Sequence, residues 1–307
     1  MHKAFGFPTL ARVREHRIDL PGGRRLVFGA LPGVMAILNV TPDSFSDGGR
    51  FASAEAAGEE GLRYAALGAA ILDIGGEGTR PRGATYGAGA TDVFLEGELA
   101  RVLPVLSYLR RNLPSFPLSV DTRRVEVARA ALDEGADVVN VVTGLDVPKD
   151  LLDLVASRGA AIVLNHCRGT PSTTFEESSF QNVTLEVTQD LETARSRALS
   201  SGIRAESIFL DPGLGFGKTP EQNFALLGAL DRLAAPRVPL VVGASRKAFL
   251  GTVAGSAVSD RLPESLAAAA VCAGAARTRP ILVRVHDVAE TLRFLAALGR
   301  TAAPTLA

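Results

Sequence analysis

The chain has 307 residues, of which 47% are hydrophobic and 21% charged, so it can bury a sizeable core in one large domain or two small ones. Lysine plus arginine and aspartate plus glutamate both number 33, so no excess charge favours nucleic acid or a membrane surface as a partner. No apolar run approaches the roughly 20 residues of a membrane-spanning helix. The first residues show no continuous apolar core followed by a small-residue cleavage site, so we expect no secretory signal. Two cysteines give neither a disulfide framework nor metal-ligand spacing. We therefore expect a cytoplasmic protein.

The first part of the chain, residues 1–32, precedes the regular pattern of the rest. Within it, IDLPGGRRLVF at 18–28 places two β-rich runs on either side of Pro-Gly-Gly, which predicts a hairpin. We expect this N-terminal extension to cover the N-terminal end of the main domain. No linker or low-complexity segment divides residues 33–300, so we expect them to form one domain.

Short apolar runs alternate with segments of helical period along that domain. The runs predict strands at 33–39, 70–74, 117–121, 137–142, 160–165, 206–211, 238–243 and 280–285. Helical segments such as 124–134 and 183–201 separate them, and several end at a glycine, the usual stop beyond a helix. The strands are apolar almost throughout, as parallel strands buried on both faces are. Eight βα units in about 250 residues predict a (β/α)8 TIM barrel, with a doubly wound open sheet as the alternative.

Polar residues follow the predicted strands at the end where this fold places catalytic groups. They are Asn39, the segment 75–81, Asp121, Asn140, Asn165 with His166, Asp211, the segment 243–247, and Arg284 with His286. One such residue is usually a turn former or a helix N-cap, but one at each of eight strands indicates a ligand site.

The types of residue indicate two parts of a ligand. Acceptors and donors that suit a flat heterocycle with an aminopyrimidinone edge are combined in Asp121, Asn140, Asp211 and Lys247. A second set contains no carboxylate and suits phosphate oxygens, because three of its members can be cationic: Asn39, Arg80, Arg284 and His286. No Ser–His or Cys–His pair is evident.

Seven motifs occur in order: ILNVTPDSFSDGG, GGEGTRP, SVDT, NVVTG, LDPGLGFGK, GASRK and RVHD. They resemble those of dihydropteroate synthases, the folate-pathway family inhibited by sulfonamides, over roughly residues 30–298. The resemblance implies a (β/α)8 barrel that usually forms a homodimer. It implies a transferase that condenses 6-hydroxymethyl-7,8-dihydropterin pyrophosphate with 4-aminobenzoate to give 7,8-dihydropteroate and pyrophosphate, with Mg²⁺ as cofactor.

The resemblance also implies roles for individual residues. The pterin-binding positions are Asp121, Asn140, Asp211, Lys247 and Asn165, of which Asp211, Lys247 and Asp121 are also catalytic. The pyrophosphate-binding positions are Asn39, Arg80, Arg284 and His286, and Asn39 is also the Mg²⁺ ligand. Two mobile loops contribute the 4-aminobenzoate positions, which are Thr41, Pro42, Asp43, Ser44 and Phe45 in one and Thr79, Arg80 and Pro81 in the other.

The chemistry is consistent with these roles. Pyrophosphate is a good leaving group once Mg²⁺ and cations take up its developing charge. The pterin nitrogens can stabilise positive charge on the exocyclic carbon, so we expect an SN1-like path that requires no strong general base.

Two strand ends depart from the family pattern. Val141 stands where an aspartate usually follows the asparagine, and Asn165 stands where a methionine usually lines the pterin pocket. A compensated exchange of polar groups between the two positions is one interpretation. A pterin-binding paralogue with weak or no synthase activity is the alternative. The methyltetrahydrofolate:corrinoid methyltransferases share the barrel but have no need of the TPDSFSDGG loop or of the pyrophosphate cations.

Overall fold

The computed structural model describes residues 15–40, 54–78, 93–170, 173–233 and 237–301. In this part of the chain, eight parallel strands close into a barrel. They are β3 (Gly33–Asn39), β4 (Ile71–Gly75), β5 (Leu118–Asp121), β6 (Val138–Val141), β7 (Ala161–Asn165), β8 (Ile208–Asp211), β9 (Leu240–Val242) and β10 (Ile281–Val285). Neighbours pair in chain order and β10 pairs with β3. The predicted (β/α)8 barrel is confirmed, and the doubly wound sheet is excluded.

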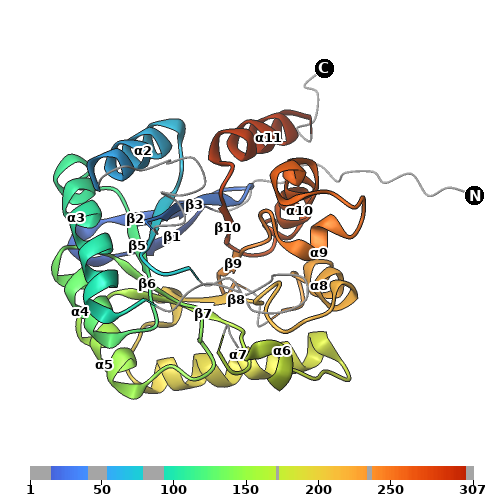
Figure 1. The fold of residues 1–307 in the computed structure, drawn as a ribbon, viewed down its shortest axis with the longest axis horizontal. Coiled ribbons are helices and arrows are strands. Elements are labelled where there is room, and N and C mark those ends of the chain that lie inside the picture. The colour runs from blue at the N-terminus through green and yellow to red at the C-terminus, as the bar shows by residue number, and fades with distance from the viewer. Residues whose placement is uncertain (1–14, 41–53, 79–92, 171–172, 234–236, 302–307) are drawn as a thin grey trace, which may run out of the picture.

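Helices surround the barrel (Figure 1). They are α2 (Ala54–Leu67), α3 (Leu95–Asn112), α4 (Val125–Asp133), α5 (Lys149–Ser157), α6 (Thr174–Glu177), α7 (Val183–Ser200), α8 (Pro220–Leu227), α9 (Ala248–Gly251), α10 (Leu262–Ala275) and α11 (Val288–Thr301). Helix α8 begins with a capping box, in which Thr219 and Gln222 each bond the other's backbone N–H. Within the described ranges, no helix combines the length and apolar character that crossing a membrane requires.

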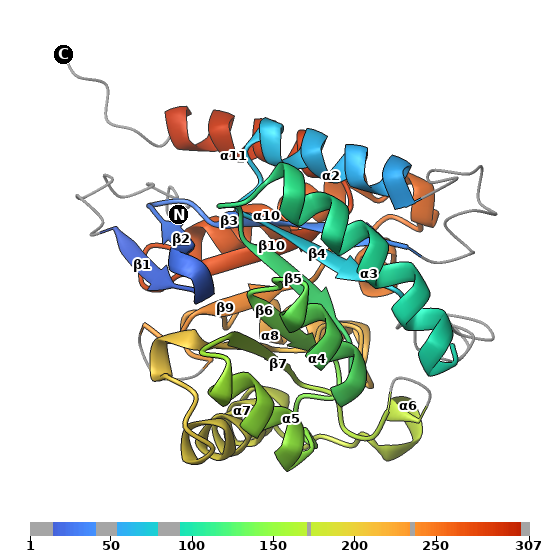
Figure 2. The same ribbon diagram turned by 90° about the vertical axis from the view of Figure 1, so that its left-hand side faces the viewer.

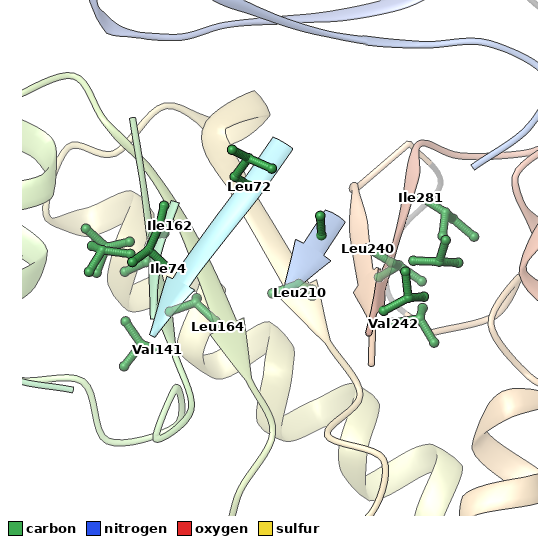
Figure 3. Close-up of a cluster of buried hydrophobic side chains, with 14 of the residues drawn as sticks. Leu72, Ile74, Val141, Ile162, Leu164, Leu210, Leu240, Val242 and Ile281 are labelled. Carbon is green, nitrogen blue, oxygen red and sulfur yellow. The ribbon is translucent and has the colours of Figure 1, made fainter. Parts of the chain in front are cut away.

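Side chains alternate along each strand between the helix layer and the barrel interior. Leu72, Ile74 and Val141 are among those that face outward and form the larger apolar cluster together with the helices (Figure 3). Met35 and Ile71 instead belong to a second cluster, which fills the interior near the N-terminal ends of the strands. Because the period is two, the strand register decides which residues of each C-terminal strand end point into the barrel.

A hairpin covers the N-terminal end of the barrel, as predicted. Strands β1 (His16–Asp19) and β2 (Arg25–Phe28) pair around the 3-10 turn Pro21–Gly23. Its apolar side chains, including Ile18 and Phe28, belong to the same cluster as the lower interior of the barrel. Figure 2 shows the hairpin at one end of the barrel, on the left.

Asp137 fastens this hairpin to the barrel. Its fully buried carboxylate accepts hydrogen bonds from Arg24 Nε in the hairpin turn at 2.5 Å and from Arg110 Nη2 on α3 at 3.0 Å. The backbone N–H of Leu118 in β5 also donates to it, at 2.9 Å. One carboxylate therefore joins the hairpin, a helix and a strand.

We predict that Asp137→Ala lowers the free energy of unfolding by about 3 kcal/mol, because it leaves two partly buried guanidinium groups without their anion. Urea denaturation of the purified variant measures this loss. The control is Asp133→Ala, which removes an exposed ion pair with Arg158 and should cost no more than about 1 kcal/mol. Equal effects of the two substitutions would contradict the anchoring role of Asp137.

Candidate active site

Polar side chains form a layer at the C-terminal end of the barrel, above its apolar interior. The register places Asn39 beside Gly75, Gly75 beside Asp121, and Asp121 beside Asn140. Asn165 and Asp211 are likewise paired on β7 and β8. The polar strand-end residues predicted from the sequence therefore lie at the same level, around the C-terminal end of the barrel.

A network on one side of this layer joins Arg284, Asp121 and Asn140 through Asp73. Arg284 Nε donates to Asp73 Oδ2 at 2.6 Å, and Arg284 Nη2 donates to Asp121 Oδ2 at 2.7 Å. Asn140 Nδ2 donates to the same Asp73 oxygen at 3.1 Å. The Asp73 side chain is fully buried. Asp73 is not among the site residues predicted from the sequence, although its position two residues before the end of β4 gives it the inward orientation of Ile71 and Gly75.

Burial sets the electrostatics of this network. Loss of water raises the pKa of Asp121, the adjacent Arg284 guanidinium opposes the rise, and the Asp73 carboxylate adds to it. Two carboxylates thus share one guanidinium, and each keeps a hydrogen-bond donor within reach.

A second group gathers around Asp211 on the opposite strands. Asp211 Oδ1 accepts the backbone N–H of Gly213 at 2.7 Å, and the Asn165 side chain also bonds this carboxylate. Lys247 Nζ donates to the carbonyl of Leu214. Burial lowers the pKa of Lys247 to about 8, although Asp211 opposes the shift, so the ammonium stays mostly protonated at neutral pH.

Gly243 leaves room between Lys247 and Asp211. A Cβ atom at this position would lie 3.8 Å from Lys247 Nζ and 3.9 Å from Asp211 Oδ2. The glycine therefore keeps a space bordered by one cation and one carboxylate, which suits a polar heterocycle edge.

The two departures from the family pattern point to opposite faces of the barrel. Val141 is buried outward, in the cluster beneath the helices (Figure 3). Asn165 instead faces inward and bonds Asp211. Asn140 also faces the interior, where it bonds Asp73. The interpretation of a compensated exchange between positions 141 and 165 is wrong, because the two side chains do not share a surface.

Lys218 stabilises the glycine-rich loop after β8 by hydrogen bonds to its backbone. Its buried Nζ donates to the carbonyls of Gly213 at 2.9 Å and Phe216 at 3.0 Å, and it lies 3.0 Å from His166 Nδ1. His166 Nε2 in turn pairs with Asp190 at 3.1 Å, and burial together with Lys218 lowers the pKa of His166 to about 4. His166 is therefore a neutral hydrogen-bonded link in the structure. Gly213 is required here, since it has a φ of +65° and a Cβ would lie 1.8 Å from the His166 carbonyl oxygen.

His286 is held by Ser245, a pair that the sequence analysis did not find. Ser245 Oγ accepts the backbone N–H of His286 and lies 3.2 Å from its Nδ1. Burial, then the charges of Arg284 and Arg246, lower the pKa of His286 to about 3. The ring is therefore neutral at pH 7. It is too weak a base to activate Ser245, and it can offer an anion a hydrogen bond but no fixed charge.

Ion pairs and hydrogen bonds tie the two ends of the segment after β4. Arg101 donates to the carbonyl of Gly76 at 2.8 Å. Glu77 accepts the backbone N–H of Val93 at 3.2 Å, and Arg124 donates to the Val93 carbonyl at 2.6 Å. The predicted loop residues Thr79, Arg80 and Pro81 fall between these ends, outside the described residues, as do Thr41, Pro42, Asp43, Ser44 and Phe45.

Asn39 lies at the edge of the layer beside Asp121. Its Oδ1 would be 3.4 Å from a Cβ on Gly75, and Asp121 Oδ2 would be 3.9 Å from the same atom. Over the described ranges, no group of three or more histidine, cysteine, aspartate or glutamate side chains could hold a metal ion.

Comparisons with known proteins agree with this geometry. The family of pterin binding enzymes matches residues 35–286. The chain is 41% identical over 270 residues to a dihydropteroate synthase from Synechocystis sp., covering 88% of this chain and 90% of the relative. A Xanthomonas albilineans dihydropteroate synthase solved with 4-aminobenzoic acid superposes with a TM-score of 0.81 at 40% identity, over 94% of this chain and 98% of that chain. The same organism's enzyme in complex with 7,8-dihydropteroate gives 0.76 at 37% identity, over 93% and 98%.

We predict that His166 and His286 stay neutral between pH 8 and pH 5, because burial disfavours their charged forms. NMR titration of the imidazole Cε1–H signals measures this, and His166→Gln and His286→Gln assign the two signals. Below pH 6.5 the unfolded chain binds protons at these histidines that the folded chain does not, so they reduce stability as the pH falls towards 4. A midpoint near 6.5 for either ring would contradict the prediction.

Proposed function

The chain belongs to the dihydropteroate synthases, within the family of pterin-binding enzymes, and from this premise we propose that the polar layer of the barrel is where its two substrates are joined. The enzyme transfers the dihydropterin methylene group from 6-hydroxymethyl-7,8-dihydropterin pyrophosphate to 4-aminobenzoate, giving 7,8-dihydropteroate and pyrophosphate. The observation that supports this location is the convergence of the Asp73–Arg284–Asp121 network and the Asp211–Lys247 group on one end of the barrel.

The pterin ring is proposed to bind between these two groups. Asp211 would accept N–H groups of the aminopyrimidinone edge with the oxygen next to Gly243, since its other oxygen is bonded to Gly213 N. Lys247 would donate to the ring carbonyl from the other side of that space. Asn140 and Asp121 would contact the pterin from the neighbouring strands, and Asn165 would act by holding Asp211.

The pyrophosphate is proposed to bind near Arg284 and His286, at the edge of the layer next to Asn39. Arg284 commits Nε and Nη2 to carboxylates, which leaves its Nη1 protons for phosphate oxygens. Asn39 would contribute one amide oxygen to Mg²⁺, a cation that commonly retains water and binds substrate phosphates. When bound, Mg²⁺ would neutralise the charge that develops on the leaving pyrophosphate.

The reaction is proposed to follow an SN1-like path. The C–O bond to pyrophosphate breaks first, and positive charge spreads from the methylene carbon into the pterin, where Asp211 and Asp121 stabilise it. The amine of 4-aminobenzoate then forms the C–N bond and releases one proton. No residue has to act as a strong base, which agrees with the low basicity of His286.

Two further properties are carried over from the family as proposals. The chain would work in the cytoplasm, and it would form a homodimer. Gel filtration combined with light scattering tests the second of these directly.

We predict that Lys247→Ala and Asp211→Asn each lower kcat/KM by at least about a hundredfold, because each removes a preorganised contact to the pterin. The assay is pyrophosphate release that depends on 4-aminobenzoate, with 7,8-dihydropteroate identified as the product. The matched control Lys149→Ala should retain the wild-type rate, since that lysine is exposed on α5 and pairs only with Asp153 among the described residues.

Two outcomes of this assay would overturn a proposal. Near-normal activity in Lys247→Ala or Asp211→Asn would contradict the assignment of these residues to the pterin site. Wild-type protein that binds the pterin pyrophosphate but forms no product would favour the pterin-binding paralogue.

We predict that EDTA abolishes most of the turnover and that Mg²⁺ restores it. Asn39→Ala should raise the Mg²⁺ concentration that gives half-maximal rate about tenfold, because it removes the proposed protein ligand. Asn112→Ala, at the exposed end of α3, is the control and should leave that concentration unchanged. Full activity in EDTA would exclude the proposed cofactor.

A further inference from the structure

Asp73 stands out among the charged interior residues because neither the motifs nor the proposed reaction assigns it a role. It lies in the middle of an otherwise apolar strand, and its carboxylate is fully buried. Oδ2 accepts two hydrogen bonds, from Arg284 and Asn140, whereas Oδ1 has no partner among the described residues. A buried carboxylate with a free oxygen is costly, so its position calls for a functional reason.

The contact with Asn140 fixes the direction of an amide. A carboxylate only accepts hydrogen bonds, so the amide nitrogen of Asn140 must face Asp73. The carbonyl oxygen of Asn140 then points the other way. Among the described residues, the Asn140 side chain has no hydrogen-bond partner besides Asp73. An acceptor is therefore what Asn140 offers to a ligand.

We propose that Asp73 is a positioning residue, which selects a 2-amino-substituted pterin by holding Asn140 with its acceptor towards the ligand. This inference rests on the proposed pterin site. The 2-amino group donates to an acceptor at this position, whereas a 2-oxo group would place two acceptors against each other. Sites built around such a bond reject the mismatched analogue strongly.

Asp73→Ala is the decisive substitution, because it removes the acceptor that holds the Asn140 amide and leaves that amide free to turn either way. Arg284 keeps Asp121 as a partner, which favours a folded protein. Asp73→Asn is the conservative second test. Arg284 Nε and Asn140 Nδ2 donate to the same Asp73 oxygen, so an asparagine with its oxygen at that position still accepts both hydrogen bonds. Its nitrogen then takes the place of Oδ1, which has no partner among the described residues.

The experiment measures binding of two probes, 6-hydroxymethylpterin and 6-hydroxymethyllumazine, which carry an amino and an oxo group at position 2. Isothermal titration calorimetry gives the ratio of their dissociation constants for each protein. Asp211 has its own preference for the amino group, but Asp211 is unchanged in every variant, so its contribution cancels when the ratios are compared. The matched control is Asp137→Asn, which alters a buried aspartate outside the site.

We expect the wild type and Asp137→Asn to prefer the pterin by similar factors. Asp73→Ala should lose about tenfold of that preference and bind both probes more weakly, whereas Asp73→Asn should retain most of the preference. Asn140→Ala retains the Asp73–Arg284 ion pair. In an Asn140→Ala background, a substitution of Asp73 should no longer change the preference for the pterin.

The outcomes separate this inference from the proposed function. If the wild type forms dihydropteroate but shows no preference for the pterin probe, this result alone contradicts the proposed orientation of Asn140. An unchanged preference in folded Asp73→Ala overturns the role of Asp73 while the pterin site stands, and so does a loss in folded Asp73→Asn as large as that in Asp73→Ala. Failure of the wild type to bind either probe would instead count against the proposed site.

Discussion

A closed barrel of eight strands forces alternate side chains into its interior, and at the C-terminal end those side chains are charged. The apolar lower half, with Met35 and Ile71, excludes water from below. Charges placed directly above such a layer are stable only when they are paired, because burial without a partner is costly. The arrangement of the whole site follows from this requirement.

Arg284 is the residue on which the pairing depends. It connects Asp73 on β4 with Asp121 on β5, and it comes from the last strand, which closes the barrel against the first. Its two carboxyl partners place hydrogen-bond acceptors beside the site, which favours a ligand that develops positive charge. Lys247 and Asp211 face this network from the opposite strands. In the proposed reaction, the pterin methylene cation and the departing pyrophosphate would each meet groups of opposite charge.

The strands could be predicted from the sequence because parallel strands buried on both faces are apolar over most of their length. Site residues such as Asn39, Asp121 and Asp211 could be predicted as well, because each is a polar residue at the end of an apolar strand. Asp73 lies inside an apolar run, so only the register shows that it points inward. The pairs Ser245–His286 and Lys218–His166 join residues far apart in the chain, and no local pattern records such contacts. Side chains alternate between the two faces of β6, but only the barrel structure shows that Val141 takes the outward face.

The Arg24–Asp137 bond has a consequence for how the chain folds. It joins residues separated by 113 positions, so the hairpin at the start of the chain cannot be fixed until β6 has formed. The apolar side chains of Ile18 and Phe28 can be buried only after the interior cluster at the N-terminal end of the barrel has formed. Contacts of such long sequence separation slow folding, and they expose hydrophobic surface while it proceeds. The hairpin, which is synthesised before the barrel strands, is therefore among the last elements to reach its native position.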